Sequence, residues 1–193
     1  MARVVLVGYD KMLYSLIERI EQTYSEILGV FRTDRIKYSG LKLFLKDIFN
    51  PSKDYTIIKS KKLYDIKGTS VNGDKFYSEI QRLKPDVIIV GSWAEKFKSR
   101  ILNTLPCINF HPALLPKNRG ANPYFWSIYL NQKVTGLTIH FMNEKFDSVK
   151  VYDILPRGRF FVKLSSSVSK TCLSFFQEPR RDPSNCYILY ILF

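Results

Sequence analysis

The sequence is poor in the residues that build metal centres and disulfide frameworks. It contains three cysteines and two histidines in 193 residues. The cysteines, Cys107, Cys172 and Cys186, show no CxxC spacing and no clustered histidines nearby. An odd number of cysteines in this arrangement argues against a disulfide framework and against a zinc site. We therefore expect no metal ligands and a reducing compartment, the cytoplasm.

Long apolar runs and acidic residues are scarce as well. No stretch approaches the roughly 20 apolar residues that a membrane span needs, and the run from Val4 to Val7 is too short for the core of a signal peptide. We therefore expect a soluble protein without a membrane partner. Asp and Glu number 17 against 30 Lys and Arg, which gives a formal net charge of +13. Such a charge attracts phosphates, nucleotides, nucleic acid or acidic membrane surfaces, and does not choose among them.

Three common active-site motifs are missing. Gly8 ends an apolar run, but the remaining glycines of a GxGxxG fingerprint do not follow it. The sequence also has no GxxxxGK[ST] loop and no GxSxG elbow. Dinucleotide binding, phosphoryl transfer by a P-loop and serine hydrolysis therefore find no support.

Apolar strands alternate with amphipathic helices along most of the chain. The pattern predicts strands over residues 3–8, 26–31, 86–90, 107–110 and 136–142, and helices over residues 11–20, 76–83 and 122–133. This order is typical of a single α/β domain whose mostly parallel central sheet is flanked by helices. Residues 36–67, rich in Lys, Tyr, Asp and Ser, fit this pattern poorly and are interpreted as an insertion or a flexible loop.

Two polar segments begin where predicted strands end. Residues 91–93 follow one strand, and residues 109–111 end the next strand along the chain. Ligands of parallel sheets bind at the carboxyl ends of the strands, so we expect both segments to lie at one edge of the sheet.

The second of these segments opens an unusual motif. Residues 108–123, INFHPALLPKNRGANP, combine an Asn-x-His triplet with an LLPxxRG run, and Asp147 lies 36 positions after His111. The pattern resembles the catalytic core of the N10-formyltetrahydrofolate-dependent formyltransferases, over roughly residues 1–165. The resemblance implies a Rossmann-like fold, N10-formyltetrahydrofolate as co-substrate and a catalytic domain over residues 1–165. Residues 166–193 do not resemble the family, and we interpret them as an atypical, truncated or altered tail.

The resemblance also assigns roles to individual residues. Asn109 and His111 would donate hydrogen bonds to the oxyanion that forms when an amine attacks the formyl carbon. Asp147 would favour the charged imidazole and accept the proton that the amine loses. His140 alternates along a predicted strand without a motif around it, so we interpret it as a structural histidine. The residues expected to hold the folate are Ser92, Trp93, Ala94, Phe97, Met142 and Asn143.

The form of the motif suggests an acceptor. RGANPYFW, residues 119–126, looks most like the short enzymes that formylate nucleotide-linked, probably dTDP-linked, amino sugars for bacterial surface polysaccharide such as the O-antigen of lipopolysaccharide. A tRNA partner is not expected, because 193 residues leave no room for the separate carboxyl-terminal domain of methionyl-tRNA formyltransferases. A homodimer is left open.

Three alternatives stay open. Methionyl-tRNA formyltransferases and glycinamide ribonucleotide formyltransferases share the Asn-x-His triplet and the distant aspartate. The third alternative is a catalytically impaired relative that binds folate or nucleotide, because Val149 stands where the family usually has glycine.

Overall fold

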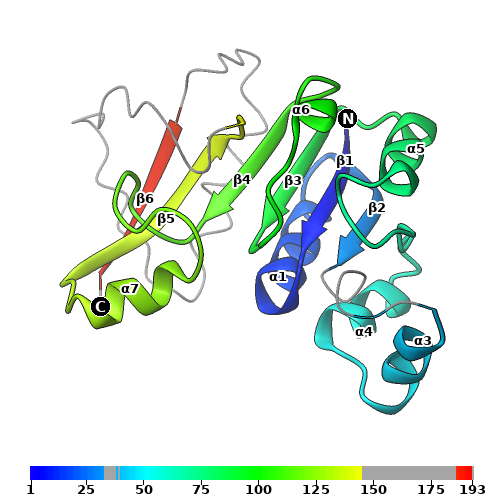
Figure 1. The fold of residues 1–193 in the computed structure, drawn as a ribbon, viewed down its shortest axis with the longest axis horizontal. Coiled ribbons are helices and arrows are strands. Elements are labelled where there is room, and N and C mark those ends of the chain that lie inside the picture. Colours follow the sequence, from blue (N-terminus) through cyan, green and yellow to red (C-terminus); the bar gives the residue numbers. More distant parts are fainter. Residues whose placement is uncertain (33–37, 39, 145–185, 193) are drawn as a thin grey trace. The chain divides into compact units, whose positions relative to one another are not determined.

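The computed structural model describes residues 1–32, 38, 40–144 and 186–192 (Figure 1). It divides into two compact units, Met1–Cys107 and Ile108–Phe193. The predicted domain boundary at residue 165 and most of the tail lie outside the described residues. No helix among the residues described is long and apolar enough to cross a membrane.

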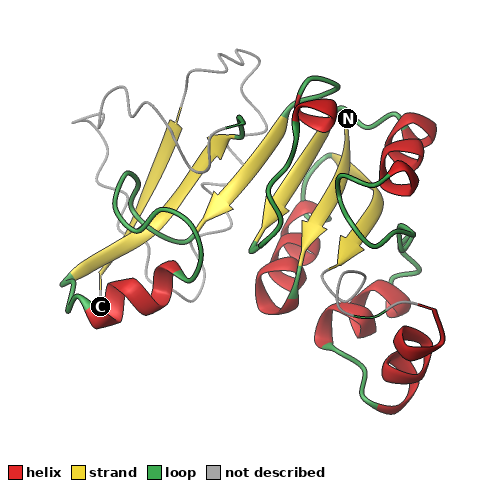
Figure 2. Ribbon diagram, viewed as in Figure 1, coloured by secondary structure: helices red, strands yellow, loops and turns green. Residues whose placement is uncertain are grey.

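The first unit is an α/β unit with a parallel sheet, as predicted. Its strands are β1 (Ala2–Gly8), β2 (Ser25–Arg32) and β3 (Val87–Gly91). Its helices are α1 (Asp10–Ile20), α3 (Gly40–Phe49), α4 (Lys53–Ser60), α5 (Asp74–Leu83) and α6 (Ser99–Leu102) (Figure 2). Strand β1 pairs in parallel with both β2 and β3, and α1 packs on all three strands.

The centre of this sheet is continuously apolar. Val4 to Val7 in β1 are fully buried, as a parallel strand covered on both faces requires. Gly8 and Gly91 are paired where β1 and β3 end. A Cβ atom at Gly8 would lie 2.3 Å from the carbonyl oxygen of Gly91, and one at Gly91 would lie 2.6 Å from a methyl carbon of Leu16. Gly8 is therefore needed for close backbone packing, which explains a glycine without the rest of a nucleotide fingerprint.

The second unit contains an antiparallel sheet. Its elements are β4 (Cys107–His111), α7 (Pro123–Tyr129), β5 (Val134–Phe141) and β6 (Cys186–Leu192). The first residue of β4, Cys107, is counted with the first unit. Strand β5 pairs antiparallel with β4 on one side and with β6 on the other. The strands and the helix predicted from residues 107–142 are confirmed, with α7 ending four residues before the predicted boundary.

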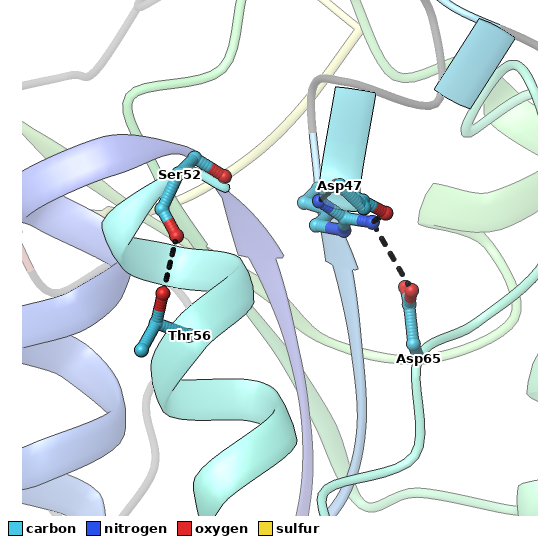
Figure 3. Close-up of polar contacts among 5 residues, drawn as sticks. Asp47, Ser52, Thr56 and Asp65 are labelled. Atoms are coloured by element: carbon cyan, nitrogen blue, oxygen red, sulfur yellow. Dashed lines mark hydrogen bonds and ion pairs between the residues drawn. The ribbon is translucent and has the colours of Figure 1, made fainter. Parts of the chain in front are cut away.

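The interpretation of residues 36–67 as an insertion or flexible loop was wrong for most of that segment. Helices α3 and α4 lie there, with Leu43, Ile57 and Ile58 buried. A buried ion pair, invisible to hydropathy patterns, fixes α3: the guanidinium of Arg32, at the end of β2, donates two hydrogen bonds to the carboxylate of Asp47. Figure 3 shows Asp47 on α3 and Asp65, after α4, directed toward the same place.

Candidate active site

The candidate catalytic residues of the second unit lie on one face of the β4–β5 pair. Asn109 and His111 are two positions apart in β4, so their side chains leave the strand on the same side. The antiparallel register places His140 opposite Asn109 and Thr138 opposite His111. Because directly opposed residues share a face, four polar side chains gather on one face of this strand pair.

Asn109 and His140 contact each other across the strands. Nδ2 of Asn109 lies 3.4 Å from Nε2 of His140, and Nδ1 of His140 lies 3.0 Å from the carbonyl oxygen of Phe141. A carbonyl only accepts, so Nδ1 of His140 carries the proton and Nε2 accepts from the Asn109 amide in the neutral ring. Both ring nitrogens have partners, as we expected of a structural histidine. One of those partners is the amide of a candidate catalytic residue, which the sequence did not indicate.

The imidazole of His111 is held by the loop that follows it. His111 is 4% exposed, and its Nε2 lies 2.9 Å from the carbonyl oxygen of Asn118. This contact requires a proton on Nε2 and fixes the orientation of the ring. Asn109 is half-buried, so its amide is the more exposed of the two expected donors.

Asn118 is a positioning residue that the sequence reasoning missed. Its side-chain amide donates to Oγ of Ser127 and to Oε1 of Gln132, both at 2.9 Å, and its Oδ1 accepts from Gln132 at 3.3 Å. Its φ is +52°, a left-handed conformation that asparagine adopts more readily than most residues. The Asn-Arg-Gly sequence at this point was the available signal, because such residues favour tight turns.

Thr138 anchors the same loop from β5. Its hydroxyl donates to the carbonyl of Ala113 at 2.6 Å and accepts the N–H of Leu115 at 3.1 Å. The hydroxyl is fully buried, so both contacts are made away from water. The loop after His111 is therefore tied to β5 at its start and to α7 by Asn118.

The residues predicted to contact folate in the first unit follow β3. The ring of Trp93 lies tilted at 57° against Phe31 with ring centroids 5.5 Å apart, and its buried Nε1 has no hydrogen-bond partner among the residues that the structure describes. Ser92 has a φ of +56° and Ala94 is exposed. Phe97 is 1% exposed and packs in the core of this unit, so its side chain does not offer a surface in this structure.

A hydrogen-bond network shapes the segment after Trp93. The carboxylate of Glu95 accepts from Ser70, from the N–H of Val71 and from the amide of Asn72. Asn72 in turn donates to the carbonyl of Lys96 and accepts from the N–H of Lys98, both at 2.8 Å. These contacts join two segments more than twenty residues apart, and no local pattern in the sequence indicates them.

The remaining predicted residues follow β5. Met142 is half-buried and Asn143 is exposed, directly after the strand that carries His140. Asp147 and Val149 lie outside the described residues. Within the second unit, the structure thus brings Asn109, His111 and His140 together and leaves the role of Asp147 a prediction.

Comparison with known proteins identifies the family. The model of the formyl transferase family matches residues 37–152, more than half of the chain. The chain belongs to the formyl transferase family. Its match to methionyl-tRNA formyltransferase of Caldanaerobacter subterraneus subsp. tengcongensis is 32% identical over 150 residues, covering 76% of this chain and 47% of the relative. The match to the Dictyoglomus turgidum protein of the same name is 31% identical and covers 84% of this chain and 54% of the relative. The chain thus spans about half the length of these curated relatives.

Solved formyl transferase structures share the fold. Phosphoribosylglycinamide formyltransferase from Bacillus halodurans superposes with a TM-score of 0.60 at 18% identity, over 76% of this chain and 74% of that chain. A formyltetrahydrofolate deformylase from Pseudomonas syringae pv. tomato gives a TM-score of 0.58 at 17% identity, over 77% of this chain and 48% of that chain. The predicted Rossmann-like formyltransferase fold is confirmed.

One expectation about partners was wrong. We expected no tRNA partner because the chain has no room for a second domain. The curated relatives with significant similarity include several methionyl-tRNA formyltransferases, which act on tRNA. Chain length was a poor guide, because the match covers the half of those relatives that resembles this chain and carries no information about the other half.

Cys107 is the second titratable residue of β4, beside His111, and its buried thiol is unsuited to act as a nucleophile. Burial raises the pKa of its thiol from 9.0 to about 12, and the thiol contacts the carbonyl of Leu105. A thiol with this pKa is protonated at neutral pH and unreactive. Covalent catalysis by a cysteine of β4 is therefore disfavoured.

Proposed function

We propose that the protein transfers the formyl group of N10-formyltetrahydrofolate to a primary amine. One observation carries the proposal: an amide and an imidazole, from Asn109 and His111, lie two positions apart on one face of β4 in a member of the formyl transferase family. Two hydrogen-bond donors on one face match the needs of an anionic tetrahedral intermediate.

The reaction divides among these groups as follows. The amine nitrogen attacks the formyl carbon, and the electrons of the carbonyl bond move to the oxygen, where Asn109 and protonated His111 donate hydrogen bonds. The amine loses a proton, for which Asp147 is the proposed acceptor. Collapse of the intermediate breaks the bond to N10, which takes up a proton and leaves as tetrahydrofolate.

The contacts around the two donors support this division. His111 is oriented by the carbonyl of Asn118, and the Asn109 amide is oriented by His140. Donors held in place before the reaction need little reorganisation when charge develops, which is the condition for efficient oxyanion stabilisation.

For the acceptor, we propose a nucleotide-linked amino sugar. The RGANPYFW form of the motif supports this choice, and the net charge of +13 suits a pyrophosphate. Methionyl-tRNA is the second candidate, because the curated relatives carry that name. We place the reaction in the cytoplasm.

The donor would contact Ser92, Trp93, Ala94 and Phe97 after β3, and Met142 and Asn143 after β5. Phe97 would contribute through its backbone, since its side chain is in the core. The buried, unpartnered Nε1 of Trp93 supports a ligand contact there, because such a group gains a hydrogen bond when an acceptor arrives. Trp93 fluorescence should therefore change when the folate is added.

The test is a product assay with the full chain. The protein is incubated with N10-formyltetrahydrofolate and, separately, dTDP-linked 3-amino and 4-amino sugars or methionyl-tRNA, and formylated products are identified by mass spectrometry. Asn109→Ala and His111→Ala should each lower turnover by about two to three orders of magnitude. Asn103→Ala, at an exposed helix end, is the matched control and should leave turnover unchanged.

Each outcome has a separate meaning. Formylated sugar without formylated tRNA supports the proposal, and the reverse result replaces the acceptor while retaining the chemistry. Unchanged turnover in both alanine variants would remove Asn109 and His111 from the mechanism. Folate binding without any formylated product would favour the catalytically impaired relative.

A further inference from the structure

Helix α3 presents an apolar face to solvent. Five of its ten residues are large, apolar and exposed: Leu41 (69%), Phe44 (61%), Leu45 (42%), Ile48 (53%) and Phe49 (80%). At about 100° per residue, these side chains occupy one continuous arc of roughly 140° around the helix. A helix of a soluble protein normally turns such a stripe toward the core.

The opposite side of α3 explains its orientation. Only Leu43 and Asp47 of this helix are buried, and they are four positions apart on one side. The carboxylate of Asp47 accepts two hydrogen bonds from Arg32, which is itself fully buried. Arg32 also contacts Asp65 at 3.4 Å and lies 4.7 Å from the ring centroid of Tyr55 in α4.

This arrangement inverts the usual amphipathic helix. The charged side chain of Asp47 is buried and paired with Arg32, whereas the large apolar side chains are exposed. Turning the helix to bury the arc would remove Asp47 from Arg32 and leave a buried cation without this partner, which is costly. The ion pair therefore fixes the apolar face in its exposed position.

Within the described residues 40–62, the exposed charges have one sign. In residues 40–62 the acidic side chains are Asp47 and Asp54, and both are buried. The exposed charged residues of this stretch are Lys42, Lys53, Lys59, Lys61 and Lys62. Lys61 is paired with Glu21 at 2.5 Å. Lys42 flanks the arc itself, about 20° around the helix from the edge of the arc at Phe49.

We propose that α3 binds the surface of an anionic lipid bilayer, with the apolar arc in the boundary between headgroups and acyl chains. A helix with Phe, Leu and Ile on one face and lysine beside it has the composition of an interfacial helix. Lysine stems extend along apolar surface and place their ammonium groups at the headgroup level. From the sequence we expected no membrane partner; this mode of binding requires no spanning segment.

Two other partners fit the observations less well. A nucleic-acid backbone would satisfy the lysines, but it offers nothing to five exposed aliphatic and aromatic side chains on one arc. A second copy of the chain could cover the arc, but pairing this face with itself would bring like-charged lysines together. The lipid surface satisfies both the apolar arc and the positive charge.

The experiment measures sedimentation of the full chain with vesicles. Vesicles of phosphatidylglycerol and phosphatidylcholine are compared with vesicles of phosphatidylcholine alone. We expect binding to the anionic vesicles, weakened by salt, and little binding to the neutral ones. An excess of tRNA added as competitor tests whether the same surface binds nucleic acid.

Matched variants separate the arc from the rest of the surface. The double variant Phe44→Ser, Phe49→Ser should weaken vesicle binding at least tenfold, since it removes two apolar side chains of the arc. Tyr24→Ser, which changes an aromatic residue that is 86% exposed elsewhere in the same unit, is the control and should bind as the unaltered protein does. Lys42→Gln should weaken binding about fivefold, and Lys11→Gln, also at an exposed helical lysine, should not.

A direct readout of insertion completes the test. In Phe49→Trp, the new indole should shift its emission to shorter wavelength with anionic vesicles, whereas in Tyr24→Trp it should not. The proposal is overturned if the unaltered protein does not bind anionic vesicles, or if the arc variant binds them equally. It is also overturned if the arc variant loses only concentration-dependent self-association in gel filtration, or only tRNA binding.

Discussion

Asn118 offers the sharpest test of how the candidate active site is supported. Its backbone carbonyl orients His111, while its side chain makes three hydrogen bonds to Ser127 and Gln132. Replacing it with glycine keeps the positive φ accessible and removes the side-chain bonds. Replacing it with alanine removes the same bonds and adds the strain of a left-handed alanine.

The magnitudes follow from these contacts. Each hydrogen bond contributes about 0.5–1.5 kcal/mol, and because Asn118 is half-buried we take the lower half of the total, about 1.5–3 kcal/mol. Alanine should cost about 1 kcal/mol more than glycine. The backbone carbonyl that accepts from His111 remains in both variants, but the side-chain bonds that fix its position are lost. We therefore expect kcat for formyl transfer to fall by roughly tenfold or more in both variants.

Asn131 supplies the matched control for this prediction. It also has positive φ (+46°), and its side chain is exposed just after α7. Urea unfolding followed by tryptophan fluorescence gives the free energy of unfolding for glycine and alanine at both positions. Equal losses at positions 118 and 131, with kcat unchanged in Asn118→Gly, would refute the assigned role of the Asn118 network.

Three further predictions concern the ion pair, the second histidine and the buried thiol. In urea unfolding, Arg32→Met alone should lower the free energy of unfolding by about 3–5 kcal/mol, and adding Asp47→Leu should recover most of that loss. Equal losses in the single and double variants would contradict a coupled pair. His140→Leu should lower kcat about tenfold with the KM for the folate unchanged, because it acts through Asn109, so a change confined to KM would assign His140 to folate binding instead. Burial raises the pKa of the Cys107 thiol from 9.0 to about 12, so the thiol should resist iodoacetamide in the folded protein at about pH 8 and react in urea. The stability that the buried thiol contributes should be complete below pH 9 and decline as the pH rises toward 12. Rapid modification of the folded protein, detected by peptide mass spectrometry, would show that the thiol is accessible.

Much of the framework was predictable from local patterns. The buried run Val4–Val7 and the helical spacing after it defined β1 and α1, because hydrophobic periodicity reflects which side of an element faces the core. Period two along β4 also sufficed to place Asn109 and His111 on one face. The motif around His111 indicated the family, which the match over residues 37–152 confirms.

The supporting contacts were not predictable from such patterns. His140 lies beside Asn109 because β4 and β5 pair antiparallel in one particular register. Alternating polarity determines which face each residue takes, but it leaves shifts by two residues open. The hydrogen bond between His111 and the carbonyl of Asn118 likewise depends on how the loop after His111 packs against α7. These are contacts between side chains and backbone groups of different elements, which local periodicity does not describe.

The segment after β2 shows the same division most clearly. The composition of residues 36–67 led us to expect an insertion or a flexible loop, whereas residues 40–49 form a helix with an apolar side. Only the tertiary structure decided which side faces inward, because that choice depends on Arg32, which reaches Asp47 fifteen residues away. The pair between Arg32 and Asp47 forms only when Asp47 faces inward, and breaking it would leave a buried charge without this partner. The orientation of α3 thus depends on a tertiary ion pair that the hydrophobic pattern does not contain.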